Sequence, residues 1–203
     1  MTNLFLKAKH WQLFLFVFGI PLTFQFIVMG TMIANIRSNT APDPALIFKY
    51  MKFFPIIMLI FIGGLFGWFW SVATGLQSKV PADVKMKVKK FKIFFFIPMI
   101  YMLFIFTGMA IVMSGMVEMI ASGEKPSETL IISLVAIILP LHIFSLFCIF
   151  YSLYFVAKTI KTVELQREVK FPDFAGEFFM IWFYPIGIWI VQPKINKMIE
   201  NKL

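Results

Sequence analysis

Residues 129–157, TLIISLVAIILPLHIFSLFCIFYSLYFVA, contain no Asp, Glu, Lys or Arg. A helix of this length, rising about 1.5 Å per residue, exceeds the ~30 Å hydrocarbon core of a membrane. Three further uncharged stretches, 11–36, 53–78 and 93–117, are also long enough to cross. The sequence therefore predicts an all-α polytopic membrane protein, with a bundle of four transmembrane helices in residues 1–157.

The composition excludes a soluble protein and offers little chemistry. Hydrophobic residues make up 60% of the 203 residues and charged residues only 14%, against about 25% charged in soluble domains. One Cys excludes a disulfide framework, and no HExxH, Gly-x-Ser-x-Gly or glycine-rich phosphate loop is present. Met109, Met113 and Met116 could bind Cu(I), but packing is preferred because no Cys or His lies among them. We expect no catalytic, cofactor or metal site, and no enzyme.

Basic residues predict the orientation. With the N-terminus inside, 15 of the 19 Lys and Arg lie on the cytoplasmic side, and only Arg37, Lys49, Lys52 and Lys125 lie outside. Because cytoplasmic loops carry an excess of Lys and Arg, both termini are expected in the cytoplasm, with 37–52 and 118–128 as outer loops. This distribution accounts for the net charge of +9 without nucleic acid.

A run of lysines precedes the third span, and it has two interpretations. Asp83 is expected to cap this helix, which places Val84, Val88 and Phe91 on one face. The first interpretation is positive-inside topology alone, and the second is a site for anionic lipid headgroups or a protein partner. The lysines are Lys85, Lys87, Lys89, Lys90 and Lys92.

Small residues recur every four positions in the second span, at Gly63, Gly67, Ser71 and Gly75. Such a stripe lies on one helix face and lets a neighbouring backbone approach closely. We expect it to pack against another helix of the same chain, with an oligomer or partner interface as the alternative.

Two polar residues lie deep in the predicted spans. His142 follows Pro140 near the middle of the fourth span, and Gln25 lies at a similar depth in the first. Intramembrane ionisable groups are functional candidates, so a proton relay or ligand-binding imidazole is one hypothesis. The preferred one is a neutral His142 bonded to Gln25, Ser145 or a freed backbone carbonyl.

Residues 158–203 form a separate cytoplasmic-face module in this interpretation. The segment 158–170 reads as a polar helix, after which Asp173 caps the next one. Residues 178–191 are uncharged but short for a span. We expect an interfacial or re-entrant helix–break–helix, with the break at Pro185–Gly187 and with Trp182 and Trp189 among headgroups; a fifth span is the alternative. Pro193 then frees the charged tail. Gln192 and Asn196, four apart on a continuing helix, are candidate partner contacts, with solvated surface residues as the preferred interpretation.

Three segments carry a resemblance: FKIFFFIPMIY (91–101), VELQREVKFPDFAGEFF (163–179) and IWFYPIGIWIVQPKIN (181–196). They resemble motifs of uncharacterised bacterial multi-pass membrane proteins, over about half of the chain. The resemblance implies a bacterial cytoplasmic (inner) membrane protein and transfers no catalytic residues.

These observations favour a non-enzymatic membrane subunit or accessory protein of a larger complex. Its expected partners are other membrane-protein subunits and anionic headgroups. The alternative is a small transporter or lipid-binding permease that uses His142.

Overall fold

The structure is a computed structural model that describes residues 2–37, 53–122 and 127–200. Within these ranges the chain is helical and contains no strand. The chain is an all-α, multi-pass integral membrane protein. Four of the described helices are long and apolar enough to cross a membrane, over His10–Asn35, Phe54–Lys79, Val88–Gly108 and Ile131–Leu165. The predicted outer loop 37–52 lies almost wholly outside the described residues. The predicted loop 118–128 is too long, because α6 continues to Ser122 and α7 begins at Glu128, and residues 123–126 lie outside the described part.

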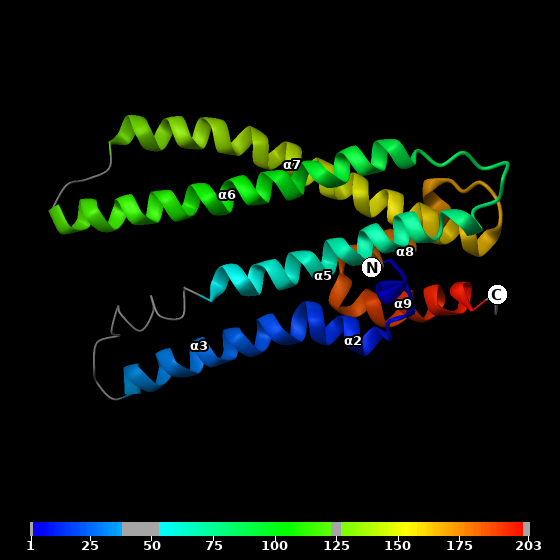
Figure 1. Ribbon diagram of the computed structural model, residues 1–203, viewed down its shortest axis with the longest axis horizontal. Coiled ribbons are helices and arrows are strands. Elements are labelled where there is room, and N and C mark those ends of the chain that lie inside the picture. Colours follow the sequence, from blue (N-terminus) through cyan, green and yellow to red (C-terminus); the bar gives the residue numbers. More distant parts are fainter. Residues whose placement is uncertain (1, 38–52, 123–126, 201–203) are drawn as a thin grey trace. The chain divides into compact units, whose positions relative to one another are not determined.

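The elements follow one another in chain order (Figure 1). The N-terminal half has α1 (Thr2–Lys7), α2 (His10–Phe14), the π-helix η1 (Leu15–Gly19), α3 (Ile20–Arg37) and α5 (Phe54–Gly75). The remainder has the 3-10 turn η2 (Gln77–Lys79), α6 (Val88–Ser122), α7 (Glu128–Leu165), α8 (Phe171–Trp182) and α9 (Tyr184–Ile199).

Proline accounts for the π-turn in the first span. Pro21 has no amide hydrogen and its ring would crowd the carbonyl four residues earlier, so a regular α-helix is strained there. The chain instead widens over Leu15–Gly19, where the Ile20 amide donates to the Leu15 carbonyl. By contrast, α6 continues through Pro98 and α7 continues through Pro140.

The chain divides into two compact units that differ from the predicted division at residue 157. The first joins Met1–Met86 to Val156–Leu203, and the second is Lys87–Phe155. Residues 158–200 are therefore no separate module: α9 packs against α1 and α2, and α1 packs against α5. The core of the first unit includes Trp68, Leu76, Ile160, Phe174 and Ile188, all less than 2% exposed.

The second unit is an antiparallel pair made by α6 and the first part of α7 (Figure 1). Ring contacts set its register: Phe91 stacks on Phe155 at 4.7 Å between centroids, and Phe94 packs on Tyr151 at 4.7 Å. The expected cap at Asp83 is wrong, because Asp83 lies in a turn closed by the Val84 amide and the Pro81 carbonyl, 3.0 Å apart. The helix begins five residues later, at Val88.

Candidate functional site

The C-terminal hairpin α8–α9 is held to the rest of the first unit by hydrogen bonds and ion pairs. Lys170 precedes α8, and its amide donates to the Asp173 carboxylate at 2.8 Å. α8 begins at Phe171 with Pro172 as its second residue, so Asp173 is the third residue of the helix and not its cap. This hydrogen bond, together with one from Arg167 at 3.2 Å, holds the pKa of Asp173 below its usual range.

The break between the two helices lies at Phe183, two residues before the predicted one. Phe183 has φ −88° and ψ 53°, which is not helical. Pro185 is the second residue of α9 and starts that helix instead of interrupting it, since an amide hydrogen has no helical partner there. α9 continues through Pro193 and runs on to Ile199. Helices of 12 and 16 residues are each shorter than a membrane span, so the alternative of a fifth spanning helix is not supported.

Gly187 lies where α9 packs tightly against α8. It is buried, and a Cβ atom placed on it would overlap the backbone of Met180 in α8. Gly187 was expected to form part of a helix break, but it lies inside α9 and serves close packing. Gly176, on the exposed side of α8, has open space around it.

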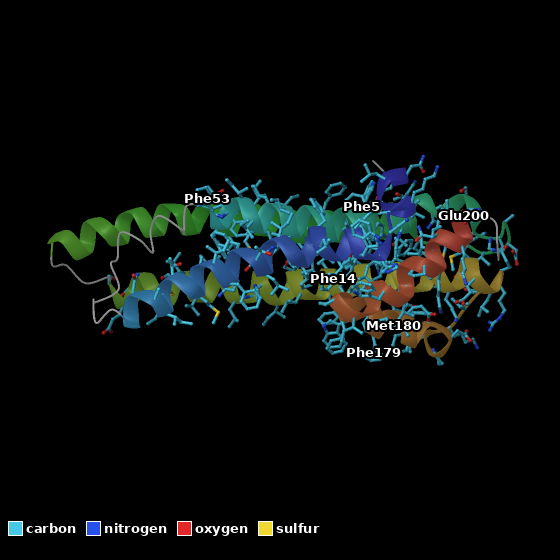
Figure 2. All side chains as sticks on the ribbon, turned by 90° about the horizontal axis from the view of Figure 1, so that it is seen from below. Phe5, Phe14, Phe53, Phe179, Met180 and Glu200 are labelled. Carbon is cyan, nitrogen blue, oxygen red and sulfur yellow. The ribbon has the colours of Figure 1, made fainter. Side chains whose placement is uncertain are left out.

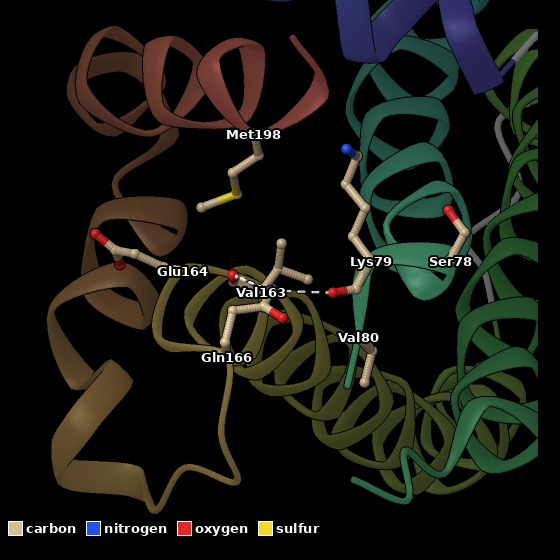
Figure 3. A pocket seen from close by; sticks show the side chains of 7 residues that line it. All are labelled: Ser78, Lys79, Val80, Val163, Glu164, Gln166 and Met198. Atoms are coloured by element: carbon tan, nitrogen blue, oxygen red, sulfur yellow. Dashed lines mark hydrogen bonds between the residues drawn. The ribbon is translucent and has the colours of Figure 1, made fainter. Parts of the chain in front are cut away.

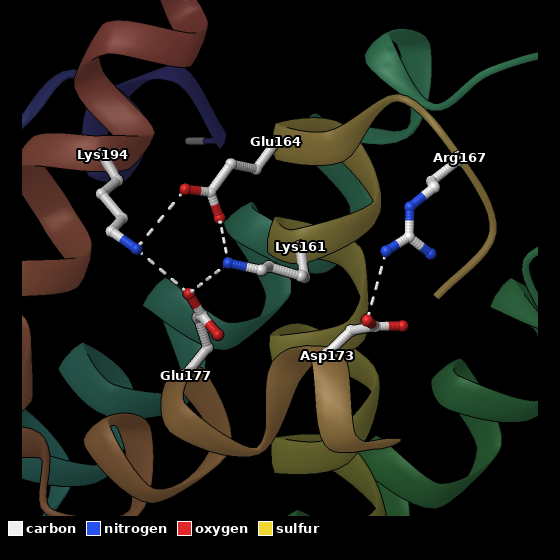
Figure 4. Close-up of polar contacts among 6 residues, drawn as sticks. All are labelled: Lys161, Glu164, Arg167, Asp173, Glu177 and Lys194. Atoms are coloured by element: carbon white, nitrogen blue, oxygen red, sulfur yellow. Dashed lines mark hydrogen bonds and ion pairs between the residues drawn. The ribbon is translucent and has the colours of Figure 1, made fainter. Parts of the chain in front are cut away.

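Four charged side chains connect α7, α8 and α9 into an ion cluster (Figure 4). Glu177 is 3.3 Å from Lys161 and 3.1 Å from Lys194, and its side chain is only 6% exposed. Glu164 completes the cluster, 2.8 Å from Lys161 and 3.5 Å from Lys194. Burial raises the pKa of a carboxyl, but the hydrogen bond from Lys194 and the charge of Lys161 outweigh it, so the pKa of Glu177 is lowered.

The predicted helix 158–170 ends five residues early, and this shorter helix allows the ion cluster to form. α7 stops at Leu165, and Gln166 has φ 49°, in the left-handed region. The chain then turns back to α8, which brings Glu177 close to Lys161. The sequence pattern predicts none of these four contacts; the available signal is Glu177, an acidic residue just before the uncharged stretch 178–191.

Gln192 ties α9 to the N-terminal segment and is fully buried. Its Oε1 accepts from the indole of Trp68 at 2.7 Å, and its Nε2 donates to the carbonyls of Ala8 at 2.9 Å and Phe5 at 3.1 Å. Asn196 donates to the Leu6 carbonyl at 2.9 Å. These amides satisfy carbonyls left open where α1 ends. The expectation that Gln192 and Asn196 face a partner is therefore wrong.

The small-residue stripe of α5 is used only in part. Positions Gly67 and Ser71 face protein: Ser71 is buried, and a Cβ on Gly67 would lie 2.8 Å from the Phe5 ring of α1. Gly63 faces open space, and its neighbour Gly64 makes the close contact instead, with Val17. Gly75, at the end of α5, is half-buried. Gly67 thus lets the N-terminal helix α1 approach α5 closely within one chain, whereas Gly63 does not take part.

His142 is paired in the second unit with Tyr101, which is not among its predicted partners. Its Nδ1 lies 3.1 Å from the hydroxyl of Tyr101 in α6. His142 also lines an apolar groove of about 460 Å3, together with Ile131, Leu134 and Leu139. Gln25 belongs to the other unit, where it is exposed on α3. Side chains 109–122, including the three candidate methionines, lie outside the described part.

The other predicted interface residues keep to the surface. All five lysines of the 85–92 run are exposed. The Lys90 ammonium also lies 5.0 Å from the ring centre of Tyr151. Trp182 is 49% exposed and Trp189 46% exposed on the hairpin. Trp189 also packs its ring on His10 at 4.6 Å and on Phe14 at 5.7 Å between centroids.

A cavity of about 460 Å3 lies where α5, α7 and α9 end (Figure 3). Gln166 crosses it, donating to the carbonyls of Lys79 at 3.2 Å and Val163 at 2.7 Å. Met198 and Glu164 also line it. Within the described residues no group of three His, Cys, Asp or Glu is placed to hold a metal ion.

No protein-family model, curated protein or solved structure matches this chain.

Proposed function

We propose that this chain is a non-enzymatic subunit or accessory protein of a larger complex in a bacterial cytoplasmic membrane. The observation that supports this is how the hairpin α8–α9 is fixed to the rest of the first unit. The charged groups of the ion cluster bind one another, and Gln192 binds backbone carbonyls of the N-terminal segment. Both sets of contacts rigidify the hairpin. A rigid module of this kind is suited to presenting a surface, because binding then costs little ordering.

The surrounding charges fit this role. The exposed lysines Lys85 and Lys87 lie in the segment between two spans, and Lys89 lies in the first turn of α6; anionic headgroups would stabilise all three there. Other membrane-protein subunits are the partners proposed for the remaining surface. The cytoplasmic placement rests on the distribution of Lys and Arg and on the resemblance to bacterial membrane proteins.

The test is purification of the tagged full chain from its native membrane in mild detergent, followed by native mass spectrometry. The expected result is a stoichiometric membrane partner, which Gly187→Leu releases by disrupting the hairpin. Gly176→Leu, at an open position of the same hairpin, is the matched control and should retain it. A wild-type chain that carries no stoichiometric partner would contradict the proposal.

The Tyr101–His142 pair favours a second candidate, a small transporter or lipid-binding permease. A polar pair beside an apolar groove could bind a headgroup or pass a proton. This candidate expects pH-dependent proton flux into vesicles that carry a trapped pH dye. His142→Gln and Tyr101→Phe should both abolish it, while His10→Gln should not. Flux that is absent from the wild type excludes proton transport.

A further inference from the structure

The end of the hairpin where α8 meets α9, defined here as Phe179–Ile186 and called the apex, has an exposed apolar face, although Ile181 and Tyr184 are buried. Phe179 is 48% exposed, Phe183 61% and Ile186 72%. No charged residue occurs between Phe178 and Val191. Figure 2 shows the aromatic side chain of Phe179 projecting from α8. An exposed surface of this kind marks contact with a partner or with lipid.

Ring contacts place the apex relative to the first span. α9 runs antiparallel to the start of that span: Asn196 bonds the segment before it, Trp189 packs on His10 and Phe14, and Tyr184 packs on Phe18 at 6.0 Å. The span begins at His10. Phe18 lies eight residues into it, or about 12 Å at the helical rise.

The charges of the hairpin lie at the opposite end from the apex. Asp173 stands in the first turn of α8 and Glu177 in its middle, whereas Lys194 and Lys197 stand in the second half of α9. From Glu177 to Phe183 the chain rises about 9 Å. The hairpin is therefore polar at its base and apolar at its apex, which is the gradient found from headgroups to acyl chains.

We infer that α8–α9 is a re-entrant hairpin whose apex lies among the lipid acyl chains of one leaflet, beside the start of the first span. The ion cluster then lies at headgroup level, and Trp189 lies near the interface that aromatic rings favour. Lipid is the occupant because the apex is level with residues already inside a span. A soluble partner could not reach it without entering the bilayer.

Site-directed spin labelling of the full chain tests the depth. In a Cys148→Ser background, which removes the one cysteine, a nitroxide is attached through Phe183→Cys or Ile186→Cys. The chain is reconstituted alone into vesicles of neutral and anionic phospholipid, so the result does not rest on the proposed function. Lys197→Cys at the base is the water-exposed control, and Ile27→Cys, exposed on α3, is the lipid-exposed control.

The expected result is strong relaxation of labels 183 and 186 by oxygen and weak relaxation by a water-soluble nickel chelate, as at position 27. Position 197 should show the reverse. Equal nickel accessibility at 183, 186 and 197 would place the apex in water and overturn the inference. Low accessibility to both reagents would mean that protein covers the apex, in this chain or a second copy, and would overturn it as well.

Discussion

Gly187 is the residue whose identity the hairpin requires most strictly. A methyl group there meets the backbone of Met180, which cannot rotate away as a side chain can. We expect Gly187→Ala to destabilise the hairpin by at least the roughly 1–3 kcal/mol typical of overpacking. Thermal unfolding in detergent should show a lower midpoint than Gly176→Ala, whose methyl enters open space. Equal midpoints would show that α8 and α9 separate without cost.

Glu177 makes the stability of the hairpin depend on pH. Its pKa is lowered in the folded chain, against about 4.3 when unfolded. The ionised form is thus favoured by folding, so this contribution is complete above that value and is lost as the pH falls through the folded pKa. Wild type should lose stability below about pH 4.3.

The matched variants isolate this effect. Glu177→Gln should lower stability at pH 7 by roughly 1.5–3 kcal/mol, because two charged hydrogen bonds are lost. The difference between wild type and variant should shrink in acid. Glu168→Gln is the control, since its side chain is 77% exposed and 3.9 Å from Lys158. A difference that stays constant between pH 7 and 3 would contradict the assignment of this pH dependence to Glu177.

At the scale of elements, α1 is held between α5 and α9 by two kinds of contact. Gly67 admits the Phe5 ring, and Gln192 bonds the carbonyls that follow it. Gly67→Leu should push α1 outward and cost roughly 1–3 kcal/mol. Gly63→Leu, one turn away at an open position, should leave the unfolding midpoint unchanged. Similar losses for both variants would show that the effect comes from the helix rather than the contact.

The amide of Gln192 gives a second test of the same element. Gln192→Leu leaves buried carbonyls without donors, at about 1–3 kcal/mol for an unsatisfied group. We expect trypsin to cleave after Lys7 and Lys9 about tenfold faster or more, since 1.4 kcal/mol is a factor of ten. Gln25→Leu, exposed on α3, should cleave at the wild-type rate. An unchanged rate in Gln192→Leu would mean that α1 is held by apolar packing alone.

For the whole molecule, the positive-inside distribution predicts the orientation. Single cysteines at positions 123 and 203, in the Cys148→Ser background, should differ when intact cells receive an impermeant maleimide. Position 123 should react from outside, and position 203 should react only after the membrane is opened. Labelling of position 203 in intact cells would show that the C-terminal half has the opposite orientation. The base of the hairpin would then not lie in the cytoplasm.

The sequence by itself determined the class of this protein and its four spans. Uncharged stretches such as 129–157 have one stable solution in lipid, since only a helix satisfies its own backbone there. It also indicated a break within 178–191, from Pro185 and Gly187, although only the structure places that break at Phe183.

The tertiary structure alone decided how the C-terminal segment is used. Ion pairs and close contacts depend on distances between residues far apart in the chain, such as Gln192 and Ala8 or Glu177 and Lys161. No periodicity encodes these distances. Gln192, a candidate partner contact in the sequence, is therefore buried. Gly187, predicted to lie in a helix break, lies where α9 packs against α8.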